Sequence, residues 1–130
     1  TIVSEINGGG DQSIGYRATV DSLQAHPNLR GIFAINDPSA LGAWDAIDEA
    51  QKAELISIVG FDGALAGKQA IAEGKIYADP IQFPKKMGQV IMEKFTAFQS
   101  GEEYEQVELI PTSLYRQADA KSDPDLQLDQ

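Results

Sequence analysis

The sequence contains no cysteine, one histidine, and only 10 basic residues against 20 acidic ones. Without cysteine it can form no disulfide, no thiolate nucleophile and no cysteine-ligated zinc site. The formal net charge of −10 argues against unaided binding to nucleic acid or to an anionic membrane, because both need a basic surface that displaces counterions. Long apolar runs are also missing, since none approaches the roughly 20 residues that span a bilayer. The simplest meaning of the acidity is a well-solvated surface.

What is present fits a single globular domain. With 130 residues, of which 42% are hydrophobic and 23% charged, the chain is large enough to bury a core. Its first residues, Thr1–Ile6, have the composition of a strand and contain neither an initiator methionine nor a charged stretch leading into an apolar one. We therefore expect a fragment of a longer protein whose targeting signal lies elsewhere.

Apolar runs of strand length alternate with helical patterns along most of the chain. The runs Gly31–Asn36 and Ile56–Phe61 predict buried strands, and each is followed by turn residues and a helix. This order predicts an α/β fold built on a parallel sheet. The other expected strands are Thr1–Ile6, Lys75–Gln82 and Val107–Ile110 with a continuation at Ser113–Tyr115, and the expected helices are Ser13–Ala25, Pro38–Gln51, Ala64–Glu73 and Pro84–Gln99.

Polar residues stand at the carboxyl ends of three of these strands. Asn36 follows the first buried run, Asp62 follows the second, and Gln82 ends the extended segment before Pro84. Ligands of open parallel sheets collect beyond this edge. Asparagine offers both a donor and an acceptor, whereas an ionised aspartate only accepts. The combination suits the hydroxyl groups of a small polar solute.

Several of these residues also have a purely structural alternative. Asp62 could cap the helix that follows it, and Gln82 could be a surface linker residue. Asp37 stands beside a proline and is expected to cap its helix rather than bind a ligand. Trp44 could stack on a sugar ring, but its helical spacing from neighbouring apolar residues favours packing.

Other chemistries find little support in the sequence. The run Gly8–Gly10 lacks the Gly-Lys-Ser/Thr ending of a phosphate-binding loop. His26 lies in a His-Pro turn away from the strand ends, where no catalytic partner is expected. A carboxylate metal site built on Asp37, Asp62 and Asp79 is conceivable, but no ligand-dense calcium loop occurs. We therefore predict no catalytic residue, no metal site and no cofactor.

Three segments in order resemble the carboxyl-terminal half of a periplasmic sugar-binding protein. They are Phe33–Asp37, Ala40–Ala43 and Val59–Gly63, and the similarity extends from about Asp11 to Tyr115. The subgroup is that of the ribose-binding proteins of ABC transporters, whose type 1 periplasmic binding fold is shared with the effector domains of LacI-type repressors. The resemblance implies a three-layer, Rossmann-like lobe that joins a second lobe through three crossing segments, with the sugar held in the cleft between them.

The resemblance also implies site residues and a domain organisation. Carried over by position, Asn36, Asp62 and Gln82 match the sugar-binding residues of the family, whereas Gly10 stands where ribose binders have an aromatic ring. Residues 1–82 would form the carboxyl-terminal lobe, residues 83–106 a crossover and a helix of the missing lobe, and residues 107–117 the returning strand or strands. The polar composition of residues 118–130 predicts a disordered tail.

The function implied is that of a non-enzymatic, periplasmic solute-binding component of an ABC importer for a ribose-like monosaccharide, with a membrane permease as partner. The alternative is the effector domain of a LacI-type transcription regulator, which a basic helix-turn-helix upstream would reveal. A flavodoxin-like receiver domain is a third reading, but Thr1–Ile6 supplies only Glu5 to the acidic cluster that it needs. The apolar helix Pro84–Gln99 is expected to fold back or to pair with a second copy as a homodimer.

Overall fold

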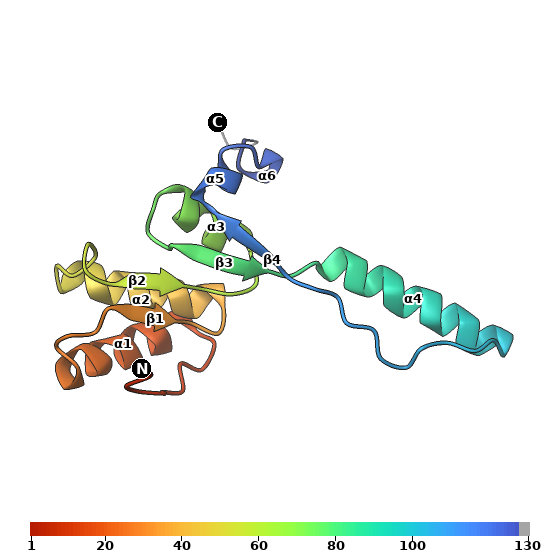
Figure 1. The fold of residues 1–130 in the computed structure, drawn as a ribbon, viewed down its shortest axis with the longest axis horizontal. Helices are drawn as coiled ribbons and strands as arrows, with labels where there is room; N and C mark the ends of the chain where they lie inside the picture. Colours follow the sequence, from red (N-terminus) through yellow and green to blue (C-terminus); the bar gives the residue numbers. More distant parts are fainter. Residues whose placement is uncertain (128–130) are drawn as a thin grey trace.

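A computed structural model describes residues 1–127 and shows a four-stranded sheet in the order β1-β2-β3-β4, with helices packed beside it (Figure 1). Strands β1 to β3 are parallel, and β4 is antiparallel to β3. This mostly parallel α/β architecture confirms the predicted fold class. The elements are α1 (Gln12–Ala25), β1 (Gly31–Phe33), α2 (Asp37–Glu49), β2 (Ser57–Val59), α3 (Leu65–Ala72), β3 (Ala78–Ile81), α4 (Pro84–Ser100), β4 (Ser113–Arg116), α5 (Gln117–Ala120) and α6 (Pro124–Gln127).

The core lies between the sheet and the helices α2 and α3. Ile47 of α2, Ile58 of β2 and Ile71 of α3 are fully buried in one cluster, each contributing about 1.5–3 kcal/mol by leaving water. Successive side chains of an extended chain point to opposite faces. Phe33, next to the buried Ala34, and Tyr77, next to the buried Ala78, are therefore exposed on the opposite face. The helices therefore hold the strands in register from one side.

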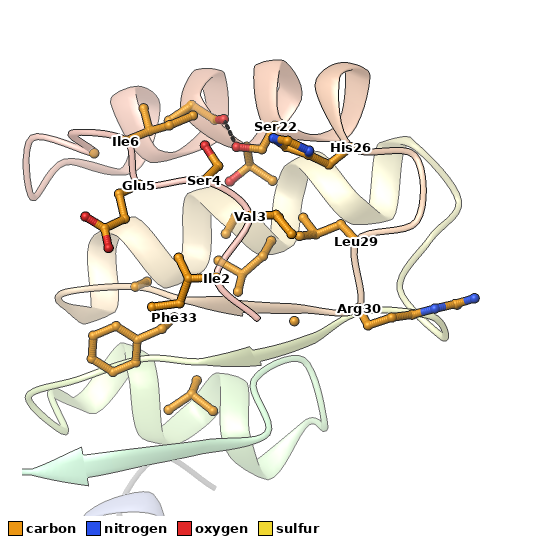
Figure 2. Close-up of a pocket in the computed structure, with 18 of the residues that line it drawn as sticks. Ile2, Val3, Ser4, Glu5, Ile6, Ser22, His26, Leu29, Arg30 and Phe33 are labelled. Carbon is orange, nitrogen blue, oxygen red and sulfur yellow. Dashed lines mark hydrogen bonds between the residues drawn. The ribbon is translucent and has the colours of Figure 1, made fainter.

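The first six residues do not form the strand that their composition predicts. Thr1–Ile6 have no regular secondary structure, and the side chains of Ile2, Val3 and Ile6 are exposed. A hollow of about 1260 Å³ lies between this segment, α1 and β1 (Figure 2). A strand is stable only when a neighbouring backbone completes its hydrogen bonds, and among the described residues no backbone hydrogen bond joins Thr1–Ile6 to β1. The prediction was wrong because composition does not reveal a partner.

The return segment after α4 also differs from the prediction. Residues 107–110, predicted as a strand, have no regular structure, whereas the predicted continuation at Ser113–Tyr115 is confirmed as β4 (Ser113–Arg116). Pro80 of β3 pairs with Leu114 of β4 in an antiparallel register. Lys94 of α4 forms an ion pair of 3.2 Å with Glu108, which ties the irregular segment to the helix. Residues 107–110 therefore run beside α4 rather than in the sheet (Figure 1).

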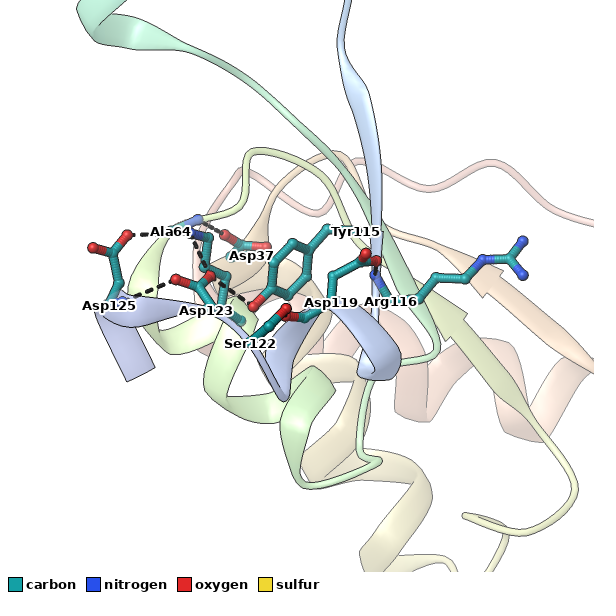
Figure 3. Close-up of polar contacts among 9 residues, drawn as sticks. Asp37, Ala64, Tyr115, Arg116, Asp119, Ser122, Asp123 and Asp125 are labelled. Carbon is teal, nitrogen blue, oxygen red and sulfur yellow. Dashed lines mark hydrogen bonds and ion pairs between the residues drawn. The ribbon is translucent and has the colours of Figure 1, made fainter. Parts of the chain in front are cut away.

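The segment from Ala118 onward, predicted as a disordered tail, forms α5 and α6 in the described residues. The Tyr115 hydroxyl donates to the buried Asp123 carboxylate at 2.7 Å, and Lys68 of α3 lies 2.9 Å from the same carboxylate (Figure 3). These contacts fix the segment onto α3. Composition indicated disorder because it shows a polar segment with two aspartates and a proline at residues 122–125, but not the lysine and tyrosine that meet it. Residues 128–130 lie outside the described part of the chain.

Helix α4 projects away from the sheet as an arm, reached through the carboxyl end of β3 (Figure 1). None of its 17 residues is buried, and Ile91, Phe95 and Phe98 are among its exposed apolar side chains. The helix ends at Gly101, whose left-handed backbone (φ 71°) suits a helix terminus. Within residues 1–127 no helix is both long and apolar enough to cross a bilayer.

Candidate functional site

The candidate site is the sheet edge at which the three parallel strands end. Asn36 follows β1, Asp62 follows β2 and Gln82 follows β3 directly. Because these strands are adjacent and parallel, their carboxyl ends lie on the same side of the sheet. The three residues chosen from the sequence therefore stand at neighbouring strand ends.

The structure joins Asp62 and Gln82 directly. The Gln82 side-chain amide donates to Oδ1 of Asp62 at 2.5 Å, and the Gln82 backbone N–H donates to the Asp62 carbonyl at 2.9 Å. The Asp62 N–H in turn donates to the Pro80 carbonyl at 3.3 Å. Both side chains are half-buried, so each keeps a face that a solute can reach.

The backbone around Asp62 is tightly constrained. Asp62 has φ 104°, in the left-handed region that favours glycine, and Gly63 follows with φ 77°. A Cβ atom at Gly63 would lie 2.2 Å from Cγ2 of Ile81, so only glycine fits there. The loop thus holds the Asp62 carboxylate in one orientation above the end of β2.

Asn36 has a different local role from the one expected. Its Oδ1 accepts from the Ser39 N–H at 3.0 Å and so caps α2, while its Nδ2 donates to the Gly10 carbonyl at 3.0 Å. In the described residues it forms no hydrogen bond with Asp62 or Gln82. Asn36 therefore fixes the start of α2 and the loop before α1 at this edge.

The cap role predicted for Asp37 was wrong, and the alternative cap role of Asp62 is also not found. Asp37 is the first residue of α2 rather than its cap, and its Oδ2 accepts from the Ala64 N–H at 2.6 Å (Figure 3). Helix α3 begins after Ala64, and no side chain caps it, so Asp62 is not its cap. The Asp62 carboxylate is thus left with Gln82 as its side-chain partner at the strand end.

Beneath the loop that carries Asp62 lies a pair of carboxyl groups that the sequence suggested only as part of a metal site, and whose burial it did not predict. Asp79 of β3 is completely buried against Asp37. Burial, and next the contact with Asp37, raise the pKa of Asp79 to about 8. The available signal was a charged residue between Ala78 and Pro80 in a buried strand. In residues 1–127 no group of three potential metal-binding side chains occurs, so the conceived metal site finds no support.

The large hollow is separate from this edge. Its lining comes from the first six residues, from α1 and from β1, and includes His26 and Leu29 but not Asn36, Asp62 or Gln82 (Figure 2). Trp44 packs against the core, which accords with its expected packing role. The polar residues at the strand ends therefore remain the best candidates for binding a solute.

Known sequences resemble most of this chain. Residues 1–103 match the profile of the periplasmic binding protein domain. Ribose import binding protein RbsB of Salmonella typhimurium is 40% identical over 78 residues, which is 60% of this chain and 26% of RbsB. The D-apiose import binding protein of Paraburkholderia graminis is 38% identical over 71 residues, covering 55% of this chain and 22% of that protein. The matched segment thus spans about a quarter of these relatives.

Solved structures show the same fold in longer chains. A periplasmic solute-binding protein of an ABC transporter from Actinobacillus succinogenes 130z, with bound D-allose, superposes with a TM-score of 0.89 at 26% identity. The superposition covers 95% of this chain and 44% of that one. A solute-binding protein from Agrobacterium vitis with bound D-fucose gives a TM-score of 0.84 at 25% identity, over 98% of this chain and 43% of that one.

Proposed function

Since this chain belongs to the periplasmic binding protein domain family, we propose that it is part of the solute-binding component of an ABC importer for a ribose-like monosaccharide. The protein would work in the periplasm and deliver its sugar to a membrane permease, without catalysing a reaction. The names of the relatives support this role, since the ribose and apiose proteins are import binding proteins. The bound D-allose and D-fucose in similar structures support a monosaccharide as the ligand class.

The observation that carries the proposal is the Asp62 carboxylate at the end of β2. An ionised carboxylate accepts hydrogen bonds from two hydroxyl groups at once, and such charge-assisted bonds are stronger than neutral ones. Gln82 fixes its orientation through the 2.5 Å hydrogen bond to Oδ1. We propose that Asp62, Gln82 and Asn36 bind the sugar hydroxyls, with the aspartate as the main anchor.

Desolvation explains why such residues suit a sugar. A hydroxyl that enters a closed cleft without finding a partner costs roughly 1–3 kcal/mol, so a polar site rejects sugars whose hydroxyls do not match it. Gly10 lies at this sheet edge, where its carbonyl accepts a hydrogen bond from Asn36, but it has no ring that could stack on the sugar face. We therefore expect selectivity to come from hydrogen bonds, with any stacking ring supplied by another part of the protein.

The proposed mechanism is closure of two lobes around the sugar. In this scheme residues 1–82 belong to the lobe that carries Asp62, the crossover begins at Phe83, and α4 belongs to the second lobe. Residues 107–117 bring the chain back to the first lobe and include β4. Sugar contacts from both lobes would favour the closed form, which the permease can distinguish from the open form. This chain alone is expected to bind sugar weakly, because it supplies only one side of the cleft.

Calorimetry on the full-length protein tests the proposal. A panel of aldopentoses and aldohexoses, including D-ribose and D-allose, is titrated into the wild-type protein and into the Asp62→Asn variant. We expect binding of at least one of these sugars and an affinity at least tenfold lower in the variant, because the amide loses the charge and one acceptor. Asp21→Asn is the matched control, since it removes a charge from an exposed position of α1. Absence of sugar binding, or equal affinity in Asp62→Asn, would refute the proposed role.

A further inference from the structure

Two buried carboxyl groups meet beneath the loop that carries Asp62. Asp37 and Asp79 are 1% and 0% exposed, and they come from different elements, the start of α2 and the middle of β3. Oδ2 of Asp37 accepts from the Ala64 N–H of the loop (Figure 3). Oδ1 of Asp37 and both side-chain oxygens of Asp79 have no hydrogen-bond donor in the described residues. Three buried acceptors without a donor require an explanation, because each would be costly if left unpaired.

The surroundings of the pair argue against a bound divalent cation. A Cβ atom at Gly60 would lie 2.4 Å from Oδ1 of Asp79, and one at Gly67 would lie 2.4 Å from the Asp37 carboxylate. The backbone of the β2–α3 loop and of α3 is thus packed directly against both groups. A magnesium or calcium ion needs six or more oxygen ligands at 2.0–2.6 Å, and residues 1–127 contain no group of three side chains that could begin such a set. A proton needs no such set of ligands. Bound to one of the two carboxyl groups, it turns that group into a hydrogen-bond donor to the other.

We propose that Asp37 and Asp79 share one proton, and that this protonated pair positions the β2–α3 loop so that Asp62 faces the ligand. The pair contacts the loop on both sides of Asp62. Asp37 holds the Ala64 N–H at one end of the loop, and Asp79 lies against Gly60 at the other end, with Asp62 between them. Asp37 and Asp79 therefore act as positioning residues for the proposed sugar site, and this part of the inference rests on the proposed function.

The charges around the pair favour a bound proton. Burial and the neighbouring Asp37 raise the pKa of Asp79 to about 8, the nearby backbone N–H of Gly60 acts in the opposite direction, and the negative charge of Asp62 adds to the rise. From the other elements, Tyr115 lies opposite Asp79 in β4 but donates to Asp123, and Lys68 of α3 pairs with Asp123 and Asp125. Above about pH 8 the proton leaves, and two buried charges in contact repel each other. The loop should then loosen, and sugar affinity should fall.

The first test observes the proton itself in the ligand-free, full-length protein. The ¹³C shifts of the aspartate carboxyl groups are followed by NMR from pH 5 to pH 10 in the wild-type protein and in Asp79→Asn. We expect one coupled titration in the alkaline range, which is absent from the variant because its amide replaces the protonated acid and donates to Asp37. If every aspartate is already ionised at pH 6, the shared proton is disproved, whatever the protein binds.

The second test measures the consequence for binding. Calorimetry with D-allose, or with whichever sugar of the panel binds most tightly, is repeated at pH 7 and pH 9. If only the protonated pair holds the binding geometry, about a tenth of the molecules remain competent one pH unit above the pKa, so affinity should fall about tenfold. Asp79→Asn should lose this dependence, so that its affinity is the same at pH 7 and pH 9. A pair that titrates without any change in affinity would overturn the positioning role, whereas failure of every sugar to bind would refute the proposed function and leave the NMR result standing.

Discussion

At the scale of single residues, Asp62 combines an unfavourable backbone with a useful side chain. Its φ of 104° is rare for a residue with a Cβ, and such conformations cost of order 1–3 kcal/mol. Three hydrogen bonds, two with Gln82 and one with the Pro80 carbonyl, hold it in place. A glycine would fit the backbone better but would carry no carboxylate. The retained strain is therefore consistent with a side chain that is kept for binding.

The shared proton of Asp37 and Asp79 predicts how stability depends on pH. The folded-state pKa of Asp79 is about 8, whereas an unfolded aspartate has a pKa near 3.9, so folding takes up a proton between these values. A raised folded pKa means that this contribution to stability is complete below about pH 4 and is lost as pH rises to about 8. One proton corresponds to a slope of at most about −1.4 kcal/mol per pH unit.

Urea unfolding of wild-type protein and Asp79→Asn at pH 5, 6, 7 and 8 measures this slope. Asp11 and Asp123 have lowered pKa values from their hydrogen bonds to Ser13 and Lys68, so they act in the opposite direction only below about pH 5, outside the range of this experiment. We expect the wild-type protein to lose stability relative to Asp79→Asn as pH rises. A constant difference across the range would contradict a proton taken up by Asp79.

At the scale of elements, substitution by alanine should have opposite effects on stability at two glycines that lie inside helices. In α3, a Cβ at Gly67 would lie 2.4 Å from the Asp37 carboxylate, whereas in α4 nothing lies within 4 Å of a Cβ at Gly88. Alanine favours a helix over glycine by about 1 kcal/mol, but forcing a methyl group into packed surroundings costs about 1–3 kcal/mol. We therefore expect Gly67→Ala to destabilise the fold and Gly88→Ala to raise the helicity of α4.

Urea unfolding and far-ultraviolet circular dichroism of the two variants measure these effects. Gly88→Ala serves as the control, because it makes the same substitution where no packing opposes it. Equal or greater stability of Gly67→Ala would show that the carboxyl pair is looser than the structure indicates.

The elements also show what could be predicted from the sequence and why. Helices and parallel strands followed from periodicity, since local patterns of apolar residues determine them, and the polar residues after the strands marked the shared sheet edge. Thr1–Ile6 and the segment after Ala118 were predicted wrongly because their state depends on distant partners. The first lacks a neighbouring backbone, and the second meets Lys68 of α3. The contact of Asp37 with Asp79, 42 positions apart in the printed sequence, was hidden for the same reason.

At the scale of the whole molecule, apolar surface is distributed unevenly. The lobe buries one face of its sheet, yet Phe33 and Ile35 on the other face are 64% and 62% exposed. Helix α4 and the segment after it expose a second apolar surface away from the sheet. Contiguous apolar surface of this kind usually meets another protein surface. In the proposed full-length protein the second lobe would cover α4, but in this chain by itself the helix needs another partner.

We predict that this 130-residue chain dimerises through α4. Ile91, Phe95 and Phe98 follow one another at spacings of four and three residues and so lie on one face of the helix. Antiparallel pairing of two such faces would bury them without moving the lobes, whereas folding back would require the segment at Phe83 to bend.

Sedimentation velocity over a range of concentrations should show a monomer–dimer equilibrium. Phe95→Glu should shift it to monomer, because a buried charge would oppose the contact, while Gln89→Glu on the opposite face should leave it unchanged. A chain that stays monomeric at every concentration, with α4 open to solvent, would contradict this prediction.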